Sequence, residues 1–288
     1  MDTLRARRSA LYMPAANVRA IEKARSLPCD VVILDLEDAV DPDMKVTARG
    51  QAVAALKAGG FGRRELVVRI NGFDTPWGRD DLVAVAEICP DAVLAPKVSA
   101  AADVMAYDAA LSGRTKLWVM VETCRALFHL EEIAATARQT RLAALVSGTN
   151  DLAKEMRCRP DVTRTPLLAP LSLTVAAARA HRLIVLDGVF NAIEDEAGFR
   201  RQCQQGVELG FDGKTLIHPS QVATANSAFA PSQEEVAWAR VVVAAFAAPE
   251  ATGQGVLRVE GRMVERLHLD QARQVLAITD TIVAAATV

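Results

Sequence analysis

Length, composition and charge bound the class of protein. The chain has 288 residues, 51% of them hydrophobic, which is enough apolar material for the core of one large domain. Its formal net charge is only -2, because 33 basic and 35 acidic residues are interspersed. Composition therefore argues against a nucleic-acid partner and against binding to an anionic membrane surface.

Cysteine usage and hydropathy indicate the compartment. The five cysteines are widely separated, with no CxxC pair and no histidine at zinc-ligand spacing. No 18-residue uncharged apolar stretch occurs, and the basic N-terminal segment lacks the apolar run of a signal peptide. We therefore expect a cytoplasmic protein with reduced thiols and no membrane segment.

Eight short β-branched runs alternate with longer alanine-rich stretches of helical spacing, as βα units do. Several runs are apolar throughout, which is typical of parallel strands covered on both faces. The predicted strands are Ala10–Pro14, Asp30–Leu36, Glu65–Ile70, Ala92–Lys97, Lys116–Glu122, Leu142–Ser147, Leu183–Val189 and Lys214–His218. Eight units within about 230 residues predict a (β/α)8 TIM barrel. A doubly wound open sheet is the alternative, but no G-x-G-x-x-G follows the first strand to bind a dinucleotide.

The sequence predicts two parts. Residues 1–230 form the catalytic barrel, and residues 231–288 form a C-terminal helical extension. The extension is expected to hold a helix over Ser232–Ala248, a short apolar segment Val256–Glu260 between glycines, and a last helix from about Leu267. The extension differs in composition from the barrel, which favours a role as a lid or as a contact between subunits.

Polar residues follow nearly every predicted strand, at the end of a barrel where active sites lie. They are Asp35, Glu37, Asp38, Arg69, Asn71, Lys97, Glu122, Asn150, Asp151, Asp187 and His218. A single charged residue at a strand end is more often a helix cap or solvent-exposed. Together, carboxylates with an arginine and a lysine but without a histidine or cysteine cluster favour a hard divalent cation such as Mg2+.

Arg69 suggests the kind of substrate. A guanidinium there would bind a planar carboxylate on two N–H donors, and the Asn71–Gly72 turn beside it would add backbone donors. Mg2+ bridging that carboxylate and a hydroxyl or keto oxygen would act as a Lewis acid. This arrangement favours aldol or Claisen chemistry.

Seven segments, in order along the chain, resemble the citrate lyase beta subunit-like family of CoA ester lyases. They are Arg8–Pro14, Asp30–Lys45, Val67–Gly72, Ala95–Val98, Val119–Thr123, Ser147–Glu155 and Gly210–Val222. The resemblance implies a (β/α)8 barrel, Mg2+ and a coenzyme A thioester as substrate. The implied reaction is carbon–carbon cleavage or condensation of a malyl-CoA, citramalyl-CoA or citryl-CoA type thioester, with acetyl-CoA and a 2-oxo acid as products.

The resemblance also assigns residues by position. Glu122 of VMVET and Asp151 of GTNDL would bind the metal ion, and Arg69 of VVRING the substrate carboxylate. Lys97 of APKV would help hold the substrate or its coenzyme. The acidic residues of DLED, which would surround metal-bound waters, are Asp35, Glu37 and Asp38.

Two further candidates come from the ends of the chain. Relatives carry a G-x-M-[IV]-D segment whose aspartate enters a neighbouring subunit's active site, whereas here the segment ends in Glu265, which is one methylene longer. The resemblance leaves open whether its role as a proton donor or acceptor is moved, altered or lost. Arg8, in a basic N-terminal cluster, is a candidate contact for coenzyme A phosphates, although such tails are more often only solvated.

The resemblance leaves three functions open. The first is the carbon–carbon lyase, the second is an acyl-CoA thioesterase on the same scaffold, and the third is a non-catalytic acyl-CoA-binding subunit. Two assemblies fit these functions: a homotrimer or hexamer that uses free coenzyme A thioesters, and a complex with an acyl carrier protein.

Overall fold

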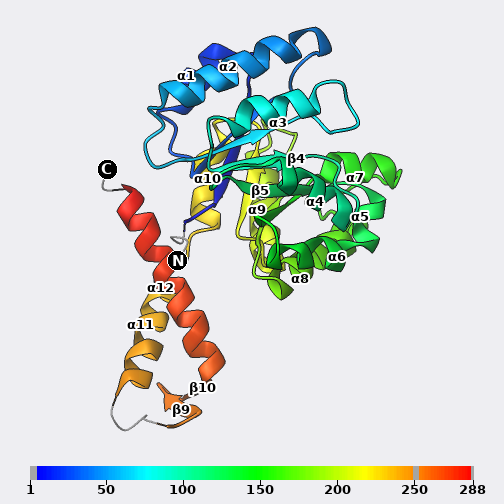
Figure 1. The fold of residues 1–288 in the computed structure, drawn as a ribbon. Coiled ribbons are helices and arrows are strands. Elements are labelled where there is room, and N and C mark those ends of the chain that lie inside the picture. The colour runs from blue at the N-terminus through cyan, green and yellow to red at the C-terminus, as the bar shows by residue number, and fades with distance from the viewer. Residues whose placement is uncertain (1–4, 249–252, 287–288) are drawn as a thin grey trace. The chain divides into compact units, whose positions relative to one another are not determined.

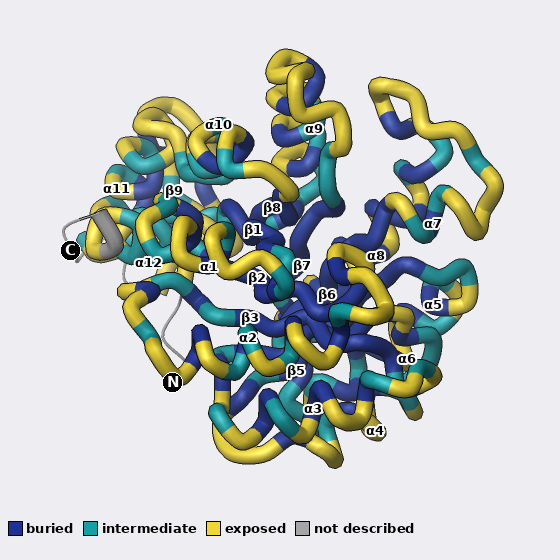
Figure 2. Tube along the Cα trace, turned by 90° about the horizontal axis from the view of Figure 1, so that it is seen from above, coloured by how far each residue is buried: buried dark blue, intermediate teal, exposed yellow. Residues whose placement is uncertain are grey.

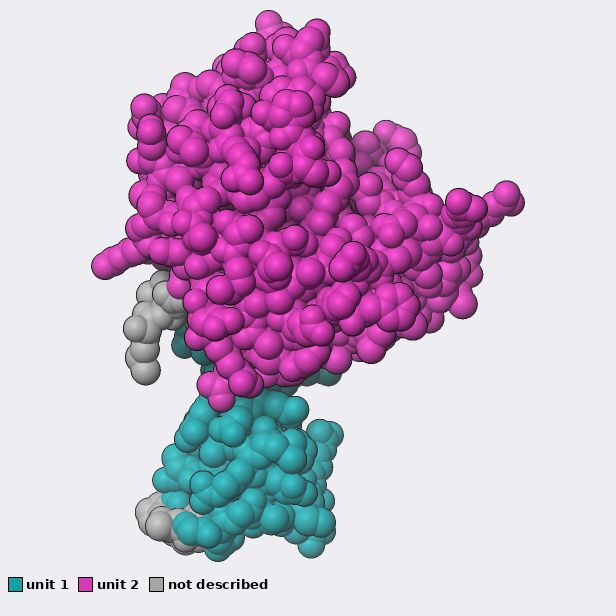
Figure 3. Space-filling view, turned by 45° about the vertical axis from the view of Figure 1, so that its right-hand side comes forward, with its two compact units in different colours: residues 1–6, 230–288 teal, residues 7–229 magenta. Residues whose placement is uncertain are grey.

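The computed structural model describes residues 5–248 and 253–286, and the chain divides into two compact units. One unit comprises residues 7–229, and the other comprises residues 230–288 with the N-terminal residues up to Ala6 (Figure 3). Each unit has its own hydrophobic core. Among the residues described, no helix combines the length and apolar character that crossing a membrane requires.

The larger unit is a closed barrel of eight parallel strands, in which β8 pairs with β1 (Figure 1). This closure confirms the predicted (β/α)8 barrel and rules out an open doubly wound sheet. The strands are β1 Ser9–Pro14, β2 Val31–Asp35, β3 Glu65–Arg69, β4 Ala92–Ala95, β5 Lys116–Val121, β6 Leu142–Ser147, β7 Ile184–Asp187 and β8 Gly213–Leu216.

Helices surround the strands, one or more after each. They are α1 Val18–Ala24, α2 Lys45–Ala58, α3 Gly78–Ala86, α4 Ala101–Ala110, α5 Cys124–Phe128, α6 Leu130–Ala135, α7 Thr149–Glu155, α8 Leu168–Ala180, α9 Glu196–Leu209 and α10 Gln221–Ala228. Single 3-10 turns occur at η1 Pro42–Met44, η2 Thr136–Arg138 and η3 Thr165–Leu167.

Several strands end earlier than predicted, so their polar residues lie in the loops that follow. β4 ends at Ala95 because Pro96 has no N–H for the strand ladder and Lys97 has a φ of +52°. Likewise β5 ends at Val121, one residue before Glu122. These short strands place charged side chains at the rim of the barrel.

Alternate strand residues fill two apolar layers. Side chains such as Tyr12, Ile33 and Trp118 pack together inside the barrel. Their neighbours in sequence, such as Leu11 and Val32, pack against the surrounding helices. Figure 2 shows the resulting core of buried strands within a ring of helices that are exposed on one side.

The C-terminal unit is a helix pair with a hairpin. It contains α11 Gln233–Ala247, β9 Val256–Val259, β10 Arg262–Glu265 and α12 Arg266–Ala286. The predicted apolar segment forms an antiparallel hairpin whose two loop residues, Glu260 and Gly261, both have positive φ. That backbone matches the right-handed strand twist.

A buried group of three charges joins β7 and β8 to the outer layer. Asp187 Oδ2 lies 2.8 Å from Lys214 Nζ, and Asp187 Oδ1 lies 2.7 Å from Arg164 Nη1, with all three residues at most 3% exposed. Burial alone would raise the pKa of Asp187, but the two cations hold it below its ordinary value. Asp187 therefore serves in a buried structural ion pair and is not one of the carboxylates at the rim of the barrel.

Replacing Asp187 with asparagine should lower the free energy of unfolding by about 3–5 kcal/mol, because Lys214 and Arg164 would remain buried without a counter-charge. Urea unfolding measures this loss. The matched control is Glu196→Gln, which breaks an exposed pair with Arg200 and should cost less than about 0.5 kcal/mol. Equal effects of the two substitutions would contradict the assigned role of the buried group.

Candidate active site

The candidate site is built on a buried ion pair between adjacent strand ends. Asp35 ends β2 and Arg69 ends β3, and the two residues are partners in the strand register. Arg69 Nε donates to Asp35 Oδ1 at 2.7 Å and Nη2 donates to Oδ2 at 2.5 Å. Such a bidentate pair has one well-defined geometry, so both side chains are held firmly.

Asp35 has its acceptor positions filled. Besides Arg69, its carboxylate accepts the backbone N–H groups of Glu37 at 2.9 Å and Ala39 at 3.3 Å, and the residue is 0% exposed. Asp35 therefore fixes the course of the chain after β2. It is placed to orient other groups rather than to exchange protons with a substrate.

The position of Arg69 corrects the predicted mode of substrate binding. Asp35 occupies the Nε–Nη2 edge that would grip a substrate carboxylate. The remaining nitrogen, Nη1, lies 2.9 Å from Glu37 Oε2, and the guanidinium stacks 4.7 Å from the centroid of the Tyr12 ring. A substrate carboxylate would therefore have to approach the Nη1 end of Arg69.

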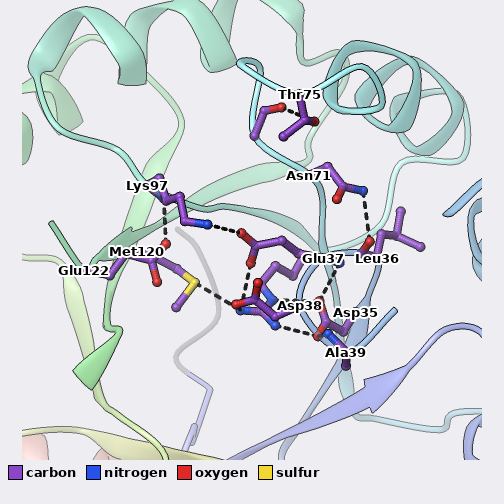
Figure 4. A network of polar contacts seen from close by, with 12 residues as sticks. Asp35, Leu36, Glu37, Asp38, Ala39, Asn71, Thr75, Lys97, Met120 and Glu122 are labelled. Carbon is purple, nitrogen blue, oxygen red and sulfur yellow. Dashed lines mark hydrogen bonds and ion pairs between the residues drawn. The ribbon is translucent and has the colours of Figure 1, made fainter. Parts of the chain in front are cut away.

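Glu37 is a buried carboxyl between two cations. Its Oε2 faces Arg69, and its Oε1 lies 3.3 Å from Lys97 Nζ (Figure 4). Burial raises the pKa of Glu37 to about 7, against the lowering effect of Arg69. The side chain of Asp38 points further outward, with 56% of it exposed, and lies 3.7 Å from Arg69 Nη1.

Glu122, just after β5, has one bonded oxygen and one open oxygen. Its Oε1 accepts the backbone N–H of Lys97 at 2.7 Å. Its Oε2 is buried and has no hydrogen-bond partner among the residues that the structure describes. Burial raises the pKa of Glu122 to about 8, and the carboxylates of Glu37 and Asp151 add to this effect.

The donor set fits a hard divalent cation. Within the described ranges, no three His, Cys, Asp or Glu side chains already converge as a metal site. The predicted site needs only two protein ligands, Glu122 and Asp151, the second of which lies in the first turn of α7. A cation would stabilise the ionised form of Glu122, which burial and then the neighbouring carboxylates disfavour, with water and substrate oxygens completing the shell of the cation.

Two predicted residues of the barrel are not brought to these carboxylates. Arg8 precedes β1, at the amino end of the barrel, where its guanidinium pairs with Asp30 at 2.8 Å. A contact with substrate at the carboxyl ends is therefore contradicted for Arg8. Asn71 is also turned away, because its amide donates to Leu36 O at 2.9 Å and to Asp81 Oδ2 at 2.6 Å.

Glu265 lies in the C-terminal unit, at the end of β10. Its side chain is exposed, and its backbone N–H donates to His268 Nδ1 at 2.9 Å. Its predicted role in a neighbouring subunit stays a prediction.

Sequence reasoning missed three residues that shape the site. Tyr12 lies under Arg69, and Met120 Sδ lies 3.8 Å from Arg69 Nη1. Gly148 leaves space for Glu122, since a Cβ there would lie 2.4 Å from Glu122 Oε2. The place of Met120 in the sequence could have predicted its position. It precedes Glu122 by two residues, and alternate residues of an extended chain face the same side.

Comparisons with known proteins agree with this architecture. The family model described as HpcH/HpaI aldolase/citrate lyase matches residues 8–219. A (3S)-malyl-CoA thioesterase of Cereibacter sphaeroides is 50% identical over 279 residues, covering 96% of each chain. An L-malyl-CoA/beta-methylmalyl-CoA lyase of the same species is 36% identical over 301 residues, covering 94% of each chain.

A solved structure is also similar. CitE of Mycobacterium tuberculosis, in complex with magnesium, acetoacetate and coenzyme A, superposes with a TM-score of 0.75. Its sequence is 30% identical, and the match covers 94% of this chain and 97% of that chain.

The raised pKa values predict how stability depends on pH without a metal ion. Glu37 and Glu122 have pKa values of about 7 and 8, above the ordinary value of 4.5, so the folded chain binds their protons more tightly than the unfolded chain. Stability in EDTA should therefore be highest near pH 5 and fall by on the order of 6 kcal/mol as the pH rises to 8. Urea unfolding across this range measures the slope.

The control for this slope is Glu122→Gln, which has no proton to lose at this position and should make the slope shallower, because only Glu37 then contributes. Added Mg2+ should stabilise the native sequence more at pH 8 than at pH 5, because the ionised carboxylates bind it. A native profile that is level or rises between pH 5 and 8 would contradict the assignment.

Proposed function

Because the chain belongs to the HpcH/HpaI aldolase/citrate lyase family, an enzymatic family, we propose that it is a Mg2+-dependent enzyme acting on malyl-CoA-type thioesters. The observation that carries the proposal is the buried Oε2 of Glu122, which has no hydrogen-bond partner among the described residues, on a side chain whose pKa is raised by burial and by the carboxylates of Glu37 and Asp151. This is a site for a hard cation, and a malyl thioester offers such a cation a carboxylate and a neighbouring hydroxyl.

Thioester hydrolysis is the reaction we propose first. It is supported by the 50% identity, over nearly the whole chain, to a protein named (3S)-malyl-CoA thioesterase. The carbon–carbon lyase predicted from the sequence is the second candidate, supported by the 36% identical malyl-CoA lyase. The same carboxylates serve either reaction, because both begin with removal of a proton from an oxygen.

Four residues have distinct proposed roles in the reaction. Glu122 and Asp151 would hold Mg2+, which would supply Lewis-acid polarisation of a substrate oxygen. Glu37, with a pKa of about 7, is suited to act as a general base near neutral pH. Lys97 Nζ, on a side chain that is 44% exposed, is placed to bind the substrate carboxylate or the coenzyme.

In hydrolysis, Glu37 would accept a proton from water as the water oxygen bonds to the thioester carbonyl carbon. The C–S bond then breaks, and the thiolate of coenzyme A leaves with the electron pair. In carbon–carbon cleavage, Glu37 would instead take the proton of the 3-hydroxyl group. The C2–C3 bond would then break to give a 2-oxo acid and the acetyl-CoA enolate, which Glu265 of another subunit would protonate. Arg69 would stabilise the ionised form of Glu37 in both cases.

The C-terminal unit is proposed to complete the site in an oligomer. By the family resemblance, Glu265 of one subunit would serve the barrel of another in a homotrimer or hexamer. An assembly with an acyl carrier protein is the alternative. The hairpin that carries Glu265 is exposed at Val256 and Met263, which suits a lid or a subunit contact.

Product analysis tests the reaction. Purified protein should convert (3S)-malyl-CoA to malate and free coenzyme A with Mg2+ present, and not in EDTA. Mass spectrometry of the products, with citramalyl-CoA and citryl-CoA in parallel, is the measurement. Acetyl-CoA plus a 2-oxo acid would instead establish the lyase, whereas tight thioester binding without turnover would favour the non-catalytic subunit.

Substitutions test the roles of the residues. Glu122→Gln and Asp151→Asn should each reduce turnover at least about 100-fold and weaken Mn2+ binding, because each removes a charged ligand. Glu265→Gln is the matched comparison, since it should lower turnover and leave Mn2+ binding unchanged. Full activity in both ligand variants would overturn the proposed metal site.

A further inference from the structure

Lys97 has a backbone conformation that few residues other than glycine adopt. Its φ is +52°, in the left-handed region, and it follows directly on Pro96. Such conformations persist only where surrounding contacts determine them, and they concentrate at functional sites. The contacts of Lys97 therefore indicate what the conformation achieves.

The backbone and the side chain of Lys97 hold different carboxylates. Its N–H donates to Glu122 Oε1 at 2.7 Å, and its Nζ lies 3.3 Å from Glu37 Oε1 (Figure 4). A hydrogen bond to a carboxylate is stronger than one between neutral groups, so the backbone contact orients Glu122.

The loop that carries Lys97 is tied to the loop that carries Glu122. Ser99 Oγ donates to Lys97 O at 3.3 Å and bonds Thr123 Oγ1 at 2.9 Å. Thr123 is also the N-cap of α5, with its side chain accepting from Ala126 N. Hydrogen bonds therefore brace both loops beside Glu122.

Gly148 confines the carboxyl from another direction. A Cβ at this position would lie 2.4 Å from both Cβ and Oε2 of Glu122. The side chain of Glu122 thus has the Lys97 N–H on one oxygen and the Gly148 backbone close to the other. Only Oε2 is left without a bond.

We propose that the left-handed backbone of Lys97 is a positioning element, which commits Glu122 Oε1 to a hydrogen bond and leaves Oε2 for a divalent cation. This inference rests on the metal site proposed above. It separates two contributions of one residue: the backbone conformation sets the affinity for the cation, and the ammonium group acts on Glu37.

The test compares three substitutions that all remove the ammonium group and keep the N–H. They are Lys97→Gly, Lys97→Met and Lys97→Val. Glycine adopts positive φ freely, and valine resists it most because it is β-branched. The Kd for Mn2+, measured on the full chain by electron paramagnetic resonance of free Mn2+, should be about threefold weaker for methionine than for glycine and about tenfold weaker for valine than for methionine.

Near-ultraviolet circular dichroism gives the folded fraction by which each Kd is corrected. A corrected Kd for Lys97→Val equal to that of Lys97→Met would overturn the inference. If Lys97→Val does not fold, Lys97→Ala replaces it. Lys97→Gly should then bind Mn2+ about threefold more tightly than Lys97→Ala. Equal Kd values for these two variants would also overturn the inference. Absence of Mn2+ binding by the native chain would overturn the metal site itself, and the inference with it.

Discussion

The ion pair between Arg69 and Asp35 organises the carboxyl end of the barrel. Asp35 accepts the N–H groups of Glu37 and Ala39, so the same carboxylate that holds Arg69 also holds the chain that carries Glu37. Arg69 in turn places its remaining nitrogen against Glu37. Because both charges are buried, removing Arg69 would leave Asp35 without its ion-pair partner at a cost of about 3–5 kcal/mol. The geometry of the site therefore depends on this pair being intact.

Around this pair the fold gathers more negative than positive charge. The carboxylates of Glu37 and Asp151 both act on Glu122, while Arg69 and Lys97 act on Glu37 as cations. Burial first, and then the neighbouring carboxylates, raise the pKa values of Glu37 and Glu122. Such an arrangement is unfavourable for folding alone, but it suits a site that receives a cation and a polar substrate. Short strands and the braced loops after β4 and β5 keep these groups in place.

Much of the fold and part of the site could be predicted from the sequence. β-branched runs at regular spacing predicted the closed barrel, because that pattern is local to each strand and helix. Polar residues at strand ends, such as Glu37 and Glu122, were predicted to meet because parallel strands end on one rim. Asn71 and Arg8 were misplaced, since their partners Asp81 and Asp30 are recognised only in three dimensions.

The sequence by itself determined the order of βα units and which charged residues lie near the rim. The tertiary structure alone decided which way those side chains face. Asp35 and Asp187 both end strands that are apolar throughout, yet Asp35 pairs with Arg69 while Asp187 pairs with Lys214 and Arg164. Strands buried on both faces show no alternation of polar and apolar residues. The sequence of one strand therefore does not show which of its side chains point into the barrel and which point toward the helices. It is set by closure of the barrel, which brings together residues distant in the chain.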